Sequence, residues 1–279
     1  MAGPTPAPVA ETAPVAETAP ETEAGGEAAI PGLPLRPVAS LFSRYELREG
    51  YDDVGAADAD AIRYRARFGL VTAPLPAGGT RTLAIRFVPQ AAGFWHVGGD
   101  TLTDASLDLH EGLLALSDEG YRLDVGRFEM VYGDHLVIGN VGWHHTGRSF
   151  DGARLHVTPG SSGLWVDGFF TVIDEGIAAT PPQGDPFAVG DRYFTGFYTG
   201  LGELIAEGFA LDLYLLGLIQ PEGFDGMTMM AIDPAHRFTF GARVKNREGI
   251  VDYRVEAGMQ AVLMAPTELT DQTAQTQRK

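Results

Sequence analysis

Hydrophobic and polar residues alternate along most of the chain from residue 35 onward. In residues 62–70 the even-numbered positions are apolar or aromatic, while Arg63, Arg65 and Arg67 lie between them. The same period of two recurs in residues 83–87, 153–157, 209–215, 238–244 and 253–261. Because successive side chains of a strand point to opposite faces, this period predicts β-strands rather than helices. We expect about eleven strands, near residues 35–48, 61–72, 80–88, 105–116, 121–132, 150–158, 163–172, 191–200, 208–219, 236–246 and 251–264.

The connections between these predicted strands alternate in length. The short ones lie near residues 74–79, 117–120, 159–162, 201–207 and 247–249, and the long ones at 49–60, 89–104, 133–149, 173–190 and 220–235. Short turns at one rim and long loops at the other are typical of outer-membrane barrels. We therefore predict an all-β fold, an antiparallel up-and-down transmembrane β-barrel. A soluble sandwich or lipocalin-like barrel shares the period of two and remains the alternative.

Two terminal segments differ from this pattern. Residues 1–33 repeat Pro-Val-Ala-Glu-Thr-Ala without any aromatic residue, which predicts a disordered acidic tail. The predicted strands occupy residues 34–264, and residues 265–279 form a polar C-terminal tail. No apolar signal region follows Met1, and we interpret the start as a shortened or mature terminus rather than that of a cytosolic protein.

Composition narrows the classes of function. The formal net charge of −17, from 37 acidic and 20 basic residues, argues against a nucleic-acid partner. The chain has no cysteine and no apolar run long enough for a transmembrane helix. No Gly-x-Ser-x-Gly motif or phosphate loop is present, so we predict that the protein is not an enzyme and needs no cofactor. His135, His144 and His145 lack the spacing of a metal site, and no metal is predicted.

The basic residues gather on the polar face of the predicted strands. If the apolar face meets lipid, this polar face lines a lumen. The predicted pore-lining residues are Arg44, Arg63, Arg65, Arg67, Arg86, Arg154, Arg243, Lys245 and Arg254. Arginine binds carboxylates and phosphates through a planar, permanently charged fork, so such a lumen would select anions. Alternatively, these cations pair within the wall and stiffen it, with Glu46, Asp108, Asp124, Asp212 and Glu256 as partners.

A family resemblance lies in the middle of the chain. Residues 126–134 read Gly-Arg-Phe-Glu-Met-Val-Tyr-Gly-Asp, followed by Ile-Gly-Asn at 138–140, Trp143, and Gly-Arg-Ser-Phe-Asp-Gly-Ala-Arg-Leu at 147–155. With His110 and Glu111 upstream, this pattern resembles the alginate-export family of bacterial outer-membrane porins. The motif positions are Glu111, Gly126, Arg127, Glu129, Gly133, Asp134, Gly147, Arg148, Phe150 and Asp151. The resemblance implies a barrel of about 18 strands, an even number as in other bacterial barrels, whose arginine-rich lumen passes anionic polysaccharide or similar solutes.

Eleven strands are too few for such a barrel, so we expect its incomplete, N-terminal part. The predicted function is that of a porin or export channel in the bacterial outer membrane, for passive passage of anionic solutes such as uronate-containing polysaccharide. The predicted partners are outer-membrane lipid and an anionic small molecule or polysaccharide. Two alternatives remain: a soluble periplasmic β-barrel or sandwich binding protein, and a non-conducting structural wall protein.

Two local features add expectations. Aromatic residues near strand ends suit the girdles that barrels place at membrane interfaces, namely Trp95, Trp165, Tyr193 and Tyr198. The alternation in residues 121–132 changes phase at Gly126, which predicts a β-bulge there.

Overall fold

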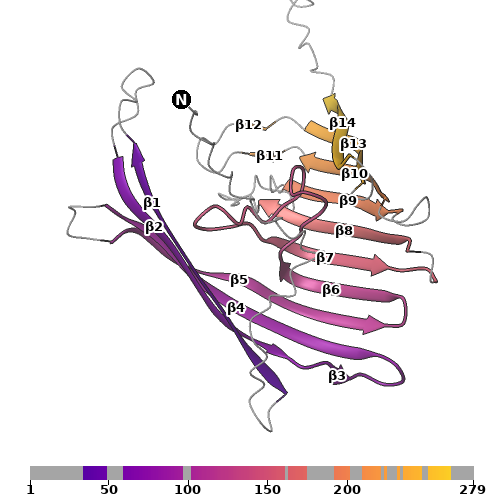
Figure 1. Ribbon diagram of the computed structural model, residues 1–279, viewed down its shortest axis with the longest axis horizontal. Coiled ribbons are helices and arrows are strands. Elements are labelled where there is room, and N and C mark those ends of the chain that lie inside the picture. The colour runs from indigo at the N-terminus through magenta and orange to yellow at the C-terminus, as the bar shows by residue number, and fades with distance from the viewer. Residues whose placement is uncertain are drawn as a thin grey trace, which may run out of the picture.

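Eleven long strands and one short strand form the main sheet of the computed structural model (Figure 1). The structure describes residues 34–48, 59–96, 102–160, 163–174, 192–201, 209–220, 223–224, 231–232, 235–246 and 251–264. The main sheet contains β1 (Leu35–Arg48), β2 (Ala59–Thr72), β3 (Leu75–Pro76), β4 (Thr82–His96), β5 (Leu102–Asp118), β6 (Tyr121–Phe128), β7 (Phe150–Val157), β8 (Trp165–Asp174), β9 (Arg192–Gly200), β10 (Phe209–Gln220), β13 (Ala235–Asn246) and β14 (Tyr253–Met264). A separate two-stranded sheet pairs β11 (Gly223–Phe224) with β12 (Ala231–Ile232). Both predicted tails, residues 1–33 and 265–279, lie outside the described residues.

Each long strand pairs antiparallel with the next long strand along the chain. The order is β1-β2-β4-β5-β6-β7-β8-β9-β10-β13-β14, with β3 pairing β4 at the side. Connections in such a sheet alternate between its two rims, so the turn 119–120 and the segment 129–149 lie at opposite rims. The predicted all-β, up-and-down topology is confirmed. No helix within the described ranges is long and apolar enough to cross a membrane.

The sheet curls but does not close among the described strands (Figure 1). Its two edges are β1 and β14, and neither pairs with the other. Because neighbours alternate in direction along a path of eleven strands, β1 and β14 run the same way. Antiparallel closure therefore requires an odd number of further strands between these edges.

The predicted long loop at 89–104 is wrong. Strand β4 continues to His96 and β5 begins at Leu102, so only residues 97–101 separate them. The pairing of β4 with β5 continues across two register shifts, at Val88/Pro89 and Ala92/Phe94. Proline lacks the N–H that a ladder needs, and a bulge is where a central strand can accommodate it. The sequence did not reveal this continuation because residues 89–93 read Pro-Gln-Ala-Ala-Gly and contain no large apolar side chain to mark an alternation.

The bulge also decides the placement of two polar side chains. Val88 pairs with Glu111 and Pro89 with Leu109, so His110 is the extra residue. Both His110 and Glu111 are buried as a result. The bulge predicted at Gly126 is not present, since β5 and β6 pair without a register shift from Gly112 to Asp118.

The two faces of the sheet differ sharply in composition and exposure. One face, which we call the outer face, carries exposed large apolar side chains such as Leu41 (81%), Phe68 (66%) and Leu107 (83%). The opposite inner face buries charged residues instead. Asp124 is 0% exposed and Arg243 is 3% exposed. This is the reverse of the arrangement in which a water-soluble sheet hides its apolar face.

Candidate functional site

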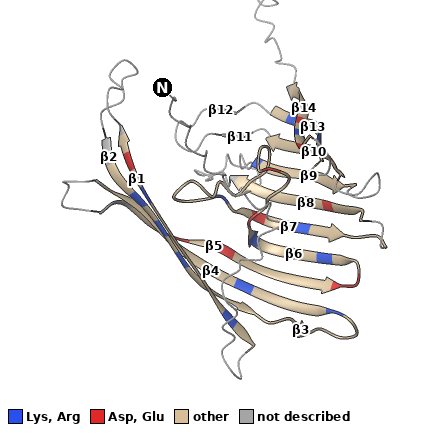
Figure 2. Ribbon diagram, viewed as in Figure 1, with Lys and Arg blue, Asp and Glu red and all other residues tan. Residues whose placement is uncertain are grey.

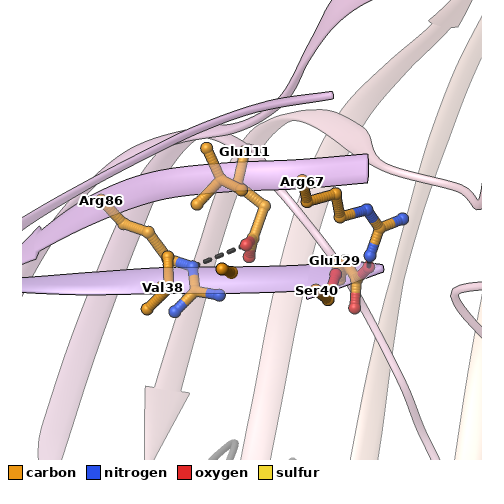
Figure 3. A pocket seen from close by; sticks show the side chains of 8 residues that line it. Val38, Ser40, Arg67, Arg86, Glu111 and Glu129 are labelled. Atoms are coloured by element: carbon orange, nitrogen blue, oxygen red, sulfur yellow. Dashed lines mark hydrogen bonds and ion pairs between the residues drawn. The ribbon is translucent and has the colours of Figure 1, made fainter. Parts of the chain in front are cut away.

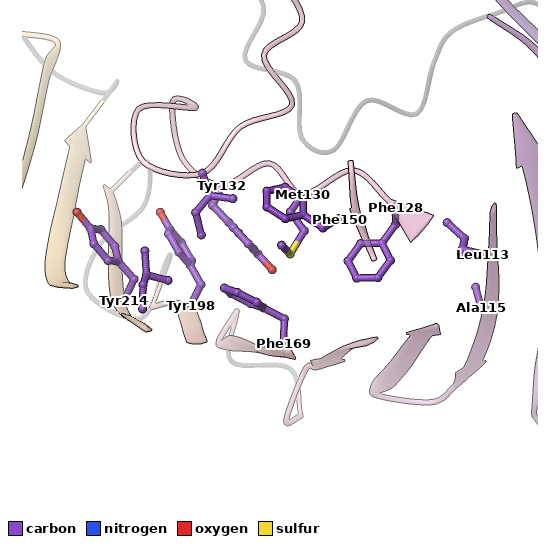
Figure 4. Close-up of a cluster of buried hydrophobic side chains, with 11 residues drawn as sticks. Leu113, Ala115, Phe128, Met130, Tyr132, Phe150, Phe169, Tyr198 and Tyr214 are labelled. Atoms are coloured by element: carbon purple, nitrogen blue, oxygen red, sulfur yellow. The ribbon is translucent and has the colours of Figure 1, made fainter. Parts of the chain in front are cut away.

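The connection between β6 and β7 lies across the inner face. We call residues 129–149 the inner loop; the sheet curls around it (Figure 1). Its apolar side chains Met130, Tyr132 and Ile138 are at most 7% exposed. They pack with sheet residues such as Phe169 and Tyr198 in one cluster (Figure 4). Full burial of a side chain like Met or Ile contributes about 1.5–3 kcal/mol, so the inner loop is held firmly against the sheet.

Parallel aromatic rings hold the centre of the inner loop. The ring of Tyr132 stacks on that of Tyr198 with centroids 4.4 Å apart, and Tyr198 stacks on Tyr214 at 5.6 Å. Trp165 stacks on Tyr198 at 5.7 Å. The Tyr132 hydroxyl donates to Asp167 Oδ2 at 2.6 Å. Burial and the charge of Asp167 raise the pKa of Tyr132, so the hydroxyl stays protonated and remains a donor.

The prediction that Trp95, Trp165, Tyr193 and Tyr198 form a girdle at the membrane interface is wrong for two of these residues. Trp165 and Tyr198 lie on the inner face, where they contact the inner loop. Trp95 is half exposed, and Tyr193 stacks on Phe170, an exposed residue of the outer face. The position of a residue near a strand end does not reveal on which face of the sheet its side chain lies.

A partly buried carboxylate anchors the start of the inner loop. Glu129 accepts hydrogen bonds from Arg67 Nη1 at 3.0 Å and Asn140 Nδ2 at 2.7 Å. His110 Nε2 lies 2.5 Å from Glu129 Oε1, and Ser149 Oγ donates to the His110 carbonyl. Burial alone would raise the pKa of Glu129. Hydrogen bonds from His110 and Asn140, with the charges of His110 and Arg67, outweigh burial and lower the pKa to about 2.

A second anchor joins the inner loop to the far side of the sheet. Asp134 accepts from Arg243 Nε at 2.9 Å and lies 3.2 Å from Arg254 Nη1 and 3.9 Å from Lys245 Nζ. Arg243 Nη1 also donates to Asp212 at 2.9 Å. Burial opposes ionisation of Asp134, but these cations outweigh it and hold its pKa below the usual range.

The third anchor is a set of backbone carbonyls. We call residues 143–146 the loop tip. The carbonyl of Trp143 accepts from Arg44 Nη1 at 2.8 Å, and that of His144 accepts from Arg65 Nη1 at 2.9 Å. The carbonyl of Thr146 accepts from Gln90 Nε2 at 2.8 Å. Three neighbouring strands, β1, β2 and β4, thus hold four residues of the loop without any carboxylate from the tip.

Two motif glycines lie where arginine side chains pass the inner loop. Gly133 has φ 56°, and a Cβ there would lie 2.8 Å from Arg243 Cδ. Gly147 has φ 70°, and a Cβ there would collide with Arg67 Nη2. A side chain at either position would strain the backbone and displace a guanidinium group. These glycines therefore permit the anchors just described.

The other motif residues have separate roles in the structure. Glu111 accepts from Arg86 Nε at 2.6 Å on the inner face. Arg127 makes a two-pronged contact with Asp151 at 2.6 and 2.7 Å and also reaches Asp108, on the face that Val125 occupies. Phe150 is buried and stacks on Phe194 at 5.9 Å. The remaining two are Gly126, with φ 125° in β6, and Arg148, whose exposed side chain follows Gly147.

All nine predicted pore-lining cations lie on the inner face. Figure 2 marks the positions of Lys and Arg along the strands in blue. Most of these nine cations are paired. Arg154 Nη2 lies 2.6 Å from Asp124, and Arg44 and Arg63 share Glu46. Arg65 differs: it is 8% exposed and, among the described residues, no carboxylate pairs with it. Its guanidinium contacts the Phe42 ring at 5.1 Å and the carbonyl of His144.

A small cavity lies between the first strands and the start of the inner loop (Figure 3). Its volume is about 30 Å³, and its charged lining is Arg67, Arg86, Glu111 and Glu129. This space suits about one water molecule rather than a sugar or an organic anion.

Sequence reasoning missed the residues that hold the inner loop, chiefly Gln90, Tyr132, Asn140 and Asp167. Tyr132 and Asn140 lie within the recognised motif, which is the signal that could have found them. No cluster of three metal-ligating side chains occurs in the described part of the chain. No family model matches the chain, and no curated protein matches it.

Proposed function

We propose that the inner face is part of the wall of a channel in the bacterial outer membrane, through which anionic solutes such as uronate-containing polysaccharide pass passively. The proposal rests on how side chains are distributed over the sheet: large apolar side chains are exposed on the outer face, and cations are buried on the inner face. The resemblance of residues 126–155 to alginate-export porins supports the same proposal. The sheet would be the N-terminal part of a barrel that additional strands complete.

The outer face is suited to lipid. Exposed apolar residues recur on strand after strand, including Leu41, Phe87, Leu114, Phe197 and Met259. A continuous apolar surface of this kind is unfavourable in water and marks a contact with lipid or protein. Strands such as β1 with 14 residues and β10 with 12 exceed the roughly 9–11 residues that a tilted membrane strand needs. In this arrangement the Arg127–Asp151 pair, at the end of β6, lies toward the rim rather than at mid-membrane.

The cations of β1 and β2 would provide the attraction for anions. Arg44, Arg63, Arg65 and Arg67 share the inner face with Glu46 and Glu129 as their nearest paired carboxylates. At physiological salt the electric fields of charges within about 8 Å of one another overlap. This excess of positive charge would therefore attract a passing anion. Binding stays weak because the arginine N–H groups are already engaged in part, and weak binding favours flux.

The test measures ion selectivity of the assembled protein in planar lipid bilayers. We expect reversal potentials that favour chloride over potassium. The variant Arg65→Gln should reduce this preference, since it removes a charge without leaving a carboxylate unpaired. The matched control is Arg81→Gln, which removes the same charge from the turn before β4, where Arg81 pairs with Asp118 at 3.4 Å. Cation selectivity in the unmodified protein would overturn the proposal.

Extensive pairing of the inner cations favours a second candidate, a non-conducting structural wall protein. Asp124, for example, pairs with two arginines, Arg122 and Arg154. In that case the protein would insert into bilayers but would carry no current; resistance to extraction from the membrane would demonstrate the insertion. The bilayer experiment therefore separates the two functions.

A further inference from the structure

The loop tip contains two adjacent histidines, and the neighbour of one of them requires it to be neutral. His145 Nδ1 lies 3.4 Å from Arg63 Nη1, and a guanidinium group can only donate. His145 Nδ1 must therefore be an unprotonated acceptor. His144 Nδ1 lies 2.7 Å from the hydroxyl of Thr146, which can donate or accept. The two imidazole rings are close to one another, with centroids 4.3 Å apart.

The charged groups packed against the loop tip are mostly positive. Strand β1 contributes Arg44 and Glu46, and β2 contributes Arg63 and Arg65. Strand β4 contributes only the neutral Gln90, while Arg67 lies beside Gly147 just beyond the tip. Glu46 already accepts hydrogen bonds from Arg44 and Arg63. A proton on His145 would thus add positive charge among four arginines and remove the acceptor that faces Arg63. Consistent with this, burial and the neighbouring charges of Arg63 and Arg44 lower the pKa of His145.

We propose that the loop tip is a pH-sensitive latch, which protonation of His145 beside Arg63 releases from β1, β2 and β4. The start of the inner loop stays docked, because Glu129, Asp134 and Tyr132 hold it through contacts that mild acid does not remove. Release would widen the passage beside the first strands, so the latch would regulate the proposed channel and rests on that function. We expect the loop tip to be released below about pH 6.5, the ordinary pKa of histidine.

Hydrogen–deuterium exchange of the full chain in detergent tests the latch without requiring transport. Rates are corrected for the intrinsic effect of pH and compared between about pH 7.5 and about pH 5. We expect residues 142–147 to exchange at least roughly tenfold faster at the lower pH, because a protonated His145 beside Arg44, Arg63 and Arg65 disfavours the docked tip. Residues 129–134 should keep their protection.

The variant His145→Gln should lose this pH dependence, because glutamine accepts hydrogen bonds but does not titrate. The matched control is His135→Asn, an exposed position with φ 62° in the same inner loop, which should behave like the unmodified protein. Equal pH profiles in His145→Gln and the unmodified chain would overturn the latch. If the variant does not fold, retained protection of the tip at the lower pH in the unmodified chain would overturn it as well. Loss of anion selectivity would leave this readout unchanged, so the two proposals fail separately.

Discussion

The two sides of the inner face use similar cations for different purposes. On the β10–β14 side, three cations meet three carboxylates, Arg243, Lys245 and Arg254 with Asp134, Asp212 and Glu256. On the β1–β2 side, four arginines meet two carboxylates, Arg44, Arg63, Arg65 and Arg67 with Glu46 and Glu129. The balanced side anchors the inner loop through side-chain ion pairs. The unbalanced side holds the loop tip through backbone carbonyls and keeps an excess of positive charge.

This difference has an energetic consequence. Arg243 lies between Asp134 and Asp212, and its side chain is 4% exposed. Removing this shared cation takes an ion-pair partner from both carboxylates, which is strongly destabilising at a buried site. Arg65 is also buried, but its removal leaves only a carbonyl without a donor. The same type of substitution should therefore lower stability much more at Arg243 than at Arg65.

The largest effect is expected from Arg243→Gln. We expect a loss of about 3–5 kcal/mol in the free energy of unfolding, because Asp134 and Asp212 lose their common partner. Urea unfolding in detergent micelles measures it. A loss below about 1 kcal/mol would mean that Lys245 and Arg254 compensate, and the two sides would then not differ as argued.

Acid should weaken the Glu129 anchor next. Because the folded-state pKa of about 2 is below the ordinary value of 4.5, this contribution is complete above about pH 4.5 and is lost as pH falls toward 2. The size is on the order of 3 kcal/mol. Unfolding midpoints measured across this range should fall in the unmodified protein. The variant Glu129→Gln should show a shallower dependence, and an identical slope would contradict the assignment.

A smaller effect is expected from Tyr132→Phe, which keeps the aromatic stack but removes the hydrogen bond to Asp167. We expect a loss of about 1 kcal/mol, since His156 still contacts Asp167 at 2.5 Å. The comparison variant Tyr132→Leu should cost more, because it also removes the ring that stacks on Tyr198. Equal losses in the two variants would show that the stack contributes nothing beyond the hydroxyl.

The smallest change in stability is expected from Arg65→Gln, below about 1 kcal/mol, because glutamine can still donate toward the loop tip. Thermal unfolding of this variant and of Arg243→Gln under one condition gives the direct contrast. A loss for Arg65→Gln as large as that for Arg243→Gln would show that the β1–β2 side is also a structural anchor.

Much of the architecture could be predicted from local pattern, but the site could not. The strand at residues 62–70 and the inward direction of its arginines follow from a period of two, which is a property of neighbouring residues. The loop predicted at 89–104 failed because residues 89–93 of β4 contain no large apolar side chain to mark the alternation. The motif residues Glu129 and Asp134 were recognised, yet their partners Arg67 and Arg243 could not be assigned. Arg243 is 109 residues from Asp134, and no local pattern specifies such a pairing.

The amino-acid sequence by itself determined that the chain forms antiparallel strands with one apolar and one cationic face, because alternation and turn chemistry act over a few residues. Only the tertiary structure decided that residues 129–149 fold inward rather than extend from the rim. It also decided that Arg243 meets two carboxylates, whereas Arg65 meets a backbone carbonyl and an aromatic ring. Those outcomes depend on how the curled sheet brings distant side chains within contact distance, and that curvature is a property of the whole sheet.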